Sequence, residues 1–237
     1  MNRILKVTRL HLVKASTFMV APLMILAIVM AISVVIAIAI QRALGDAAST
    51  TEYIEGARYN SAIMWALPGF LIYYGVQAIA TTYPFALALG TTRRDFILGT
   101  VIANAVQSAY IALLLLVLLG LELVTNHWFA GVYVLDTYVV GAGDPVALVV
   151  RSFVGVLFCL TAGGMFGAVW VRFGPKGPAV VGLALGLVVA LGVLIIAPRI
   201  GEIIASVTVA GLGVATVIAV IVCLVATWFA MRRASVR

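Results

Sequence analysis

Long apolar runs, separated by short polar segments, extend along almost the whole chain. A helix of about 20 apolar residues crosses the ~30 Å hydrocarbon core of a bilayer, and six of the runs reach that length. We therefore predict an all-α integral membrane protein with six transmembrane helices in a single domain over residues 1–237. The predicted spans cover about 18–40, 62–86, 97–121, 146–170, 178–197 and 203–230, after a basic segment at 1–16.

The composition excludes a soluble globular fold. Of the 237 residues, 65% are hydrophobic and 10% are charged, whereas a soluble domain carries about 25% charged residues. The net charge of +7 does not indicate nucleic-acid binding, because the basic residues flank apolar runs and form no patch with interleaved aromatic residues. Cys159 and Cys223 lie inside apolar runs, where we expect them to pack as small apolar side chains.

The positions of lysine and arginine predict the orientation in the membrane, because these residues are enriched in cytoplasmic segments. With the N-terminus inside, eleven basic residues fall in inner segments: Arg3, Lys6, Arg9, Lys14, Arg93, Arg94, Arg172, Lys176, Arg232, Arg233 and Arg237. The four outer ones are Arg42, Arg58, Arg151 and Arg199, and seven of the eight acidic residues also fall outside. We therefore expect a multi-pass protein of the cell membrane with both termini cytoplasmic.

The segment LGTTRRDFILG, between the second and third predicted spans, carries more polar residues than a simple turn requires. Gly90 is suited to end one helix in a left-handed conformation, and Thr92 followed by Asp95 has the spacing of a capping box at the start of the next. Arg93 and Arg94 then project from the turn. These two arginines are either positive-inside anchors or part of a docking surface for a soluble partner.

The longer stretch FALALGTTRRDFILG resembles the cytoplasmic loop between the second and third helices of ABC-2-type transporter permeases. The basic N-terminus, the six spans and the inside termini agree with that family in arrangement. The resemblance implies a subunit that binds a cytoplasmic ATP-binding subunit, which holds ATP and Mg²⁺, and that pairs with a second copy or a sister permease. The implied ATPase-coupling element consists of Gly90, Thr91, Thr92, Arg93, Arg94 and Asp95.

Polar residues recur on one face of the second predicted span and on one face of the third. In hydrocarbon such groups either bond one helix to another or line a pathway. As a set they form the candidate translocation surface: Tyr73, Gln77 and Thr81 in the second span, and Asn104, Gln107 and Ser108 in the third. Packing between helices is the alternative role for each of them.

Two patterns concern the shape of the helical bundle. Pro68 and Pro84 are expected to bend or end the second predicted span. Stripes of small residues, which allow helices to approach closely, occur in the fourth and fifth spans. They are Gly155, Gly163 and Gly167 in the fourth, and Gly182 and Gly186 in the fifth.

The N-terminal stretch RILKVTRLHLVK is predicted either to lie as a helix on the inner membrane surface or to be a basic flank continuous with the first span. Its basic residues share a broad arc of a helical wheel. The residues opposite that arc are Ile4, Leu5, Thr8 and Leu12.

The segment TNHWFAGVYVLDTYVVGAGDP is predicted to lie outside, with some strand-like alternation before a glycine-rich turn that Pro145 closes. His127 is its only histidine, so we predict no metal site. The chain also contains no phosphate-loop motif, no zinc motif and no nucleophile elbow. We therefore expect no catalytic site in this chain.

The expected function is that of the membrane-spanning permease subunit of an ATP-driven exporter. Its expected substrate is an amphiphilic drug, peptide or lipid-like molecule, and ATP hydrolysis is expected on a separate subunit. Export and substrate class both follow from the resemblance. The alternative is a membrane protein with a structural or regulatory role and no transport activity, in which the two arginines of the TTRRD segment only set the topology.

Overall fold

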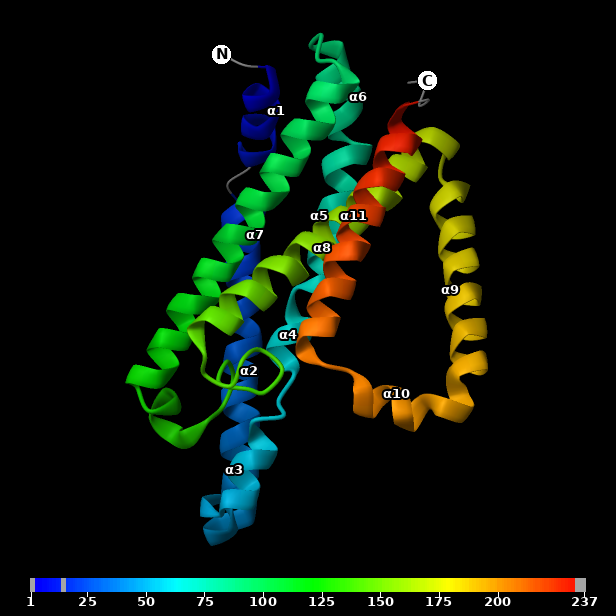
Figure 1. The fold of residues 1–237 in the computed structure, drawn as a ribbon. Coiled ribbons are helices and arrows are strands. Elements are labelled where there is room, and N and C mark those ends of the chain that lie inside the picture. The colour runs from blue at the N-terminus through cyan, green and yellow to red at the C-terminus, as the bar shows by residue number, and fades with distance from the viewer. Residues whose placement is uncertain (1–2, 14–15, 233–237) are drawn as a thin grey trace. The chain divides into compact units, whose positions relative to one another are not determined.

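In the computed structural model, which describes residues 3–13 and 16–232, the apolar runs form helices (Figure 1). The α-helices are α1 (Arg3–Leu12), α2 (Ala21–Leu44), α3 (Thr51–Ala57), α4 (Ala62–Ala66), α5 (Pro68–Ala80), α6 (Thr82–Ala88), α7 (Arg93–Val124), α8 (Pro145–Phe173), α9 (Lys176–Ile196), α10 (Ile200–Ser206) and α11 (Val209–Arg232). The shorter helical turns are η1 (Ser16–Val20), η2 (Gly45–Ser49), η3 (His127–Gly131) and η4 (Ala197–Arg199). These described ranges contain no strand.

Six helical stretches of the described chain are long and apolar enough to cross a membrane. They are Ser16–Ser49, Thr51–Ala88, Arg93–Val124, Pro145–Phe173, Lys176–Ile203 and Val209–Arg232. This confirms the all-α class and the six candidate spans. The sixth span begins later than predicted, at Val209, because the short helix α10 occupies part of the connection that precedes it.

The second candidate span is made of four consecutive helices, α3 to α6, and a proline lies in the first turn of two of them. Pro68 opens α5, and Pro84 is the third residue of α6. A proline lacks a backbone N–H and is tolerated in the first helical turn, where that N–H would have no partner within the helix. The prediction that both prolines interrupt this span is therefore confirmed.

Two compact units, each built from non-adjacent segments, make up the chain. Unit 1 comprises Met1–Val7, Ile72–Thr100 and Phe158–Arg237, and unit 2 comprises Thr8–Leu71 and Val101–Leu157. Each unit is described by itself.

In unit 2, the π-helical turn η1 is bonded to α7 by two side chains. The Gln107 amide donates to the Phe18 carbonyl oxygen at 2.9 Å, and the Tyr110 hydroxyl donates to the Met19 carbonyl oxygen at 3.1 Å. The rings of Phe18 and Tyr110 also stack, with centroids 5.9 Å apart. Because apolar surroundings offer no hydrogen bonds to irregular backbone, these two side chains stabilise the turn that precedes α2.

In unit 1, α5 and α8 approach each other through glycines. A Cβ atom added at Gly163 would overlap the carbonyl oxygen of Ile72, and one added at Gly167 would lie 2.7 Å from the carbonyl oxygen of Val76. On the α5 side, a Cβ atom at Gly75 would overlap the Leu160 carbonyl oxygen. Two of the small residues predicted for the fourth span therefore act in close helix packing.

The other predicted small residues do not pack in this way. A Cβ atom added at Gly155, Gly182 or Gly186 would meet nothing within 4 Å. Gly182 and Gly186 belong to α9, which stands apart from α11 and joins it through α10 (Figure 1). No residue of α9, which lies wholly in the described part of the chain, is buried.

The helix predicted near the N-terminus is present as α1, and it packs on the first turns of α7. A Cβ atom at Gly99 would lie 2.6 Å from Val7 Cβ and 2.9 Å from the Ile4 carbonyl oxygen. The buried face of α1 carries Val7, Thr8 and His11. This buried face is rotated from the predicted apolar face, since Leu5 is 53% exposed. Gly99 has no side chain and so leaves space for α1 to pack against α7. Placement on a membrane surface stays a prediction.

Acidification is expected to loosen α1 through His11. Burial lowers the pKa of His11 from 6.5 to about 4, so the packed helix holds the imidazole neutral while a released helix takes up a proton. The stability of the packed position is therefore complete above pH 6.5 and falls as the pH drops toward 4, by about 2 kcal/mol at pH 5. Amide hydrogen exchange of α1, corrected for its intrinsic pH dependence, measures this loss.

The matched control for this prediction is His11→Phe, which keeps a buried ring without a titrating group. In that variant the protection of α1 should be equal at pH 7.5 and pH 5. Protection in the parent protein that does not change between these two pH values would contradict a role for His11.

Candidate functional site

The turn between α6 and α7, in unit 1, is built as the sequence predicts. Gly90 has φ of +78°, and its N–H donates to the Leu87 carbonyl oxygen at 2.9 Å while the Thr91 N–H donates to that of Ala86 at 3.1 Å. These two bonds form a Schellman motif that ends α6. The Thr92 hydroxyl oxygen then accepts from the Asp95 N–H at 3.2 Å, which caps α7.

Two buried aromatic rings fix the angle between α6 and α7. Tyr83 and Phe96 are both fully buried, and their rings meet edge to face with centroids 5.2 Å apart. This arrangement of rings is favourable beyond the burial of area. The exposed tip of the turn therefore rests on a packed base.

The two arginines of the turn differ in their surroundings. Arg93 Nη1 donates to the Arg232 carbonyl oxygen in the last turn of α11, at 2.8 Å. Arg172, at the end of α8, donates to the Phe229 carbonyl oxygen at 3.2 Å. Basic side chains bonded to the last carbonyls of a helix stabilise its C-terminus. Arg94 is exposed, so of the two it is the one that a partner can reach without breaking a bond within the chain.

The polar residues predicted on the second span lie at the surface of unit 1. Tyr73 is 60% exposed, Gln77 is partly buried and Thr81 is exposed. The Thr81 hydroxyl donates to the Gln77 carbonyl oxygen at 2.7 Å, where α5 gives way to α6. This face stays a candidate for a translocation surface.

The polar residues predicted on the third span lie inside unit 2. Asn104, Gln107 and Ser108 are 6%, 1% and 0% exposed. Gln107 bonds to Phe18, as described above, and the Ser108 hydroxyl donates to the Asn104 carbonyl oxygen at 2.8 Å. Such bonds within unit 2 are expected if these residues serve in packing between helices, the alternative to lining a pathway.

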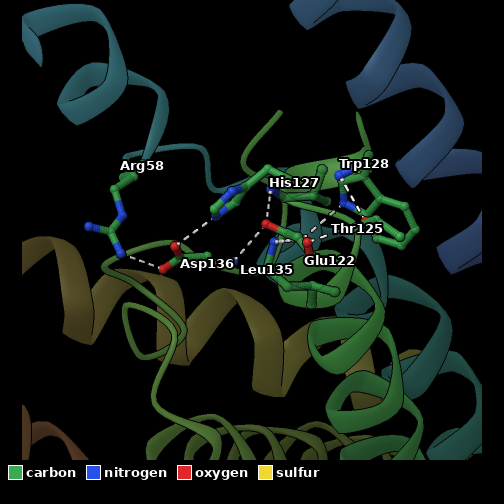
Figure 2. Close-up of polar contacts among 8 residues, drawn as sticks. Arg58, Glu122, Thr125, His127, Trp128, Leu135 and Asp136 are labelled. Atoms are coloured by element: carbon green, nitrogen blue, oxygen red, sulfur yellow. Dashed lines mark hydrogen bonds and ion pairs between the residues drawn. The ribbon is translucent and has the colours of Figure 1, made fainter. Parts of the chain in front are cut away.

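A buried carboxylate, Glu122 near the end of α7, organises the loop that follows. Its side chain is fully buried. The N–H groups of Val134, Leu135 and Asp136 donate to it at 3.0, 2.8 and 3.1 Å, and the indole N–H of Trp128 donates at 3.1 Å. Three successive N–H groups around one anion form a backbone nest, and here the anion belongs to the same chain (Figure 2).

A second carboxylate, Asp136, joins the loop to a distant segment. Asp136 Oδ1 lies 2.5 Å from Arg58 Nη2, and Oδ2 lies 3.1 Å from His127 Nε2 (Figure 2). The Arg58 guanidinium also lies over the rings of Tyr133 and Tyr138, at 5.9 and 5.3 Å from their centroids. The cluster therefore combines an ion pair with cation–π contacts.

These bonds hold a strained turn. The residues 126–129 all have positive φ, between 51° and 60°, and none of them is glycine. Each such residue is disfavoured by roughly 1–2 kcal/mol. The Glu122 and Asp136 bonds offset that strain, so the cluster supports one loop conformation.

Other side chains tie the same loop to α2 and α8. The Gln41 amide donates to the Ala130 carbonyl oxygen at 3.0 Å, and Arg151 Nη1 donates to the carbonyl oxygens of Tyr138 and Val139 at 3.1 and 3.0 Å. The strand-like alternation of this segment forms no strand, because the N–H groups of 134–136 bond to Glu122 and not to a neighbouring strand. We call residues 125–144 the loop cap.

From the sequence alone, Arg58, Glu122 and Asp136 are predicted only to be outer charges. The signal that could have identified Glu122 is its position inside the apolar run, before the run ends at Val124. Both oxygens of Glu122 accept two bonds each, which suits structural support better than proton transfer. Among the described residues, no group of three or more His, Cys, Asp or Glu is placed to hold a metal ion.

The fold and these two sites define a class: a multi-pass α-helical protein with six candidate membrane-spanning helices. Comparison with protein-family models, curated proteins and solved structures finds no match to this chain.

Proposed function

We propose that the chain is the membrane-spanning permease subunit of an ATP-driven exporter of amphiphilic molecules. ATP and Mg²⁺ would bind to a separate cytoplasmic subunit, and the permease would pair with a second copy or a sister permease. The α6–α7 turn, with the segment GTTRRD, would be the docking element. The observation that supports this proposal best is the construction of that turn: an exposed Arg94 on a tip fixed by a Schellman motif, a helix cap and two buried rings.

A docking element has to transmit force as well as bind. Arg93 provides a direct connection, because its bond to the Arg232 carbonyl oxygen joins the turn to the end of α11. The turn is also continuous with α7, whose first turns carry the packed helix α1 at Gly99. A push on the turn would therefore reach α1, α7 and α11 together.

The expected result of Arg94→Glu is loss of the ATPase partner without loss of fold. An arginine at the centre of an interface is often worth about 2 kcal/mol or more, which corresponds to about 30-fold weaker binding. The measurement is a mild-detergent pull-down of the tagged chain from its native membranes, scored for co-purifying ATP hydrolysis. Lys176→Glu, which reverses an exposed charge at the α8–α9 turn of the same unit, is the matched control and should retain the partner.

A parallel variant, Arg93→Gln, should retain binding but reduce ATPase-driven transport, because it removes the bond to α11 and leaves Arg94 in place. A chain that purifies without any ATPase would contradict the proposal. It would favour the non-transporting structural or regulatory alternative, for which the bonds of Gln107 and Ser108 within unit 2 are the supporting observation.

A further inference from the structure

A pocket of about 500 Å³ lies beside the last turns of α2, within unit 2. One wall is a single face of α2, formed by Ser33, Ile36, Ala37 and Ile40, whose spacing of three and four residues places them in one row. The opposite wall comes from α3, the residues that follow it and the loop cap. The volume falls in the range of small-molecule sites, roughly 300–1,000 Å³.

The chemistry of the pocket changes along its length. The most buried α2 residue of its lining is Ser33, which is 8% exposed and has no hydrogen-bond partner among the bonds of the described residues. About 10 Å of apolar helix surface separates it from Ile40. Three tyrosines, Tyr53, Tyr59 and Tyr133, belong to the wall opposite α2. An apolar body therefore fits along α2, with aromatic rings on the opposite wall.

The chain segment that forms this wall, from η2 to the end of α3, carries mostly negative charges. Glu52 and Glu55 are exposed on α3, the helix that contributes Tyr53 to the pocket, and Asp46 is exposed in η2 just before it. In the described part of the chain none of these three carboxylates forms an ion pair. The chain has two basic residues between positions 41 and 61. Arg58 is paired with Asp136, so Arg42 is the one that remains to balance the three carboxylates.

We propose that this pocket binds a lipophilic cation: an organic molecule with an apolar body and one positive charge. The apolar body would lie along α2, and the charge would lie against the rings of Tyr53 and Tyr59, which attract cations through their π faces. Tyr133 already has the Arg58 guanidinium over its ring and would contribute apolar contact. Glu52 and Glu55, on the same helix as Tyr53, would favour the approach of a cation. The inference rests on the proposed function only where it calls the ligand an export substrate. Binding itself requires neither ATP nor a partner subunit.

The test uses the full chain in phosphatidylcholine nanodiscs and radiolabelled methyltriphenylphosphonium as the probe, with empty nanodiscs as background. Triphenylphosphine oxide is the competitor, because it has nearly the same shape and no net charge. We expect saturable binding of one cation per chain, and at least tenfold weaker competition by the neutral compound. No saturable binding, or equal competition by the neutral compound, would overturn the proposal.

One matched pair of variants and one double variant locate the site. Ala37→Trp fills the pocket and should weaken binding at least tenfold. Val35→Trp adds the same bulk to the 66% exposed side of α2 and should leave binding unchanged. The double variant Glu52→Gln and Glu55→Gln changes only exposed groups, so it should fold, and it should weaken binding about fivefold.

If Ala37→Trp or the Gln double variant binds as the parent does, the site is elsewhere and the proposal is wrong. The result is independent of the docking experiment. Cation binding without a co-purifying ATPase would contradict the proposed transporter function and support the cation site. A co-purifying ATPase without cation binding would support the transporter function and contradict the cation site.

Discussion

Glu122→Gln is expected to destabilise the protein by about 3–5 kcal/mol, because it disrupts the centre of the loop cap. The amide that replaces one carboxylate oxygen presents N–H groups to N–H donors, which leaves buried donors of the loop without acceptors. Each such donor costs about 1–3 kcal/mol, and breaking a buried charged interaction typically costs 3–5 kcal/mol. If the amide nitrogen takes the place of Oε2, the indole N–H of Trp128 also loses its acceptor, which removes a bond that supports the strained turn at 126–129.

Two measurements check this prediction. Thermal unfolding in detergent should show a lower midpoint, and amide hydrogen exchange should show lost protection at Val134, Leu135 and Asp136, whose N–H groups bond to Glu122. Glu52→Gln, the same change at an exposed position, is the control and should alter neither. Protection of the three amides at parent level in Glu122→Gln would show that the loop cap does not depend on this carboxylate.

Gly163→Leu is expected to prevent α5 and α8 from packing, and Gly163→Ala to destabilise by about 2 kcal/mol or more. A Cβ atom at this position overlaps the Ile72 carbonyl oxygen and lies 3.0 Å from Gly75 Cα. These neighbours are backbone atoms, so relief requires a shift of a whole helix, and overpacking of this kind costs about 1–3 kcal/mol.

The control for this prediction is Gly155→Ala on the same helix, where an added Cβ meets nothing within 4 Å. That change should be neutral or stabilising by up to about 1 kcal/mol, because alanine favours a helix more than glycine does. Size-exclusion chromatography after stepwise heating ranks the three variants. Equal stability of the two alanine variants would contradict the close approach of α5 and α8.

The features that follow from local physics could be predicted from the sequence. The six spans follow from run length, the interruptions in the second span follow from Pro68 and Pro84, and the start of α7 follows from Thr92. Each depends on residues within one or two helical turns. The predicted positions of helix ends were less accurate. For example, α2 continues to Leu44, past its predicted end near residue 40.

The parts that could not be predicted depend on partners far along the chain. Arg58 meets Asp136 across 78 positions, and Arg93 meets the Arg232 carbonyl oxygen across 139. The positions of these residues in a single sequence do not predict that they are in contact. Counting charges for topology also treats every acid as exposed to water, and this assumption hid the buried Glu122. Gly75 was missed because its stripe partner, Gly163, lies on another helix.

The bonds of Glu122 also suggest an order of events during synthesis. Its backbone donors follow it by only 12 to 14 residues, and contacts of such short sequence separation form early. We expect the loop cap to close around Glu122 as soon as residue 136 has emerged, before α8 has been made. Arg58 would then join a loop already in shape, and α8 would enter the membrane from a fixed starting point at Pro145.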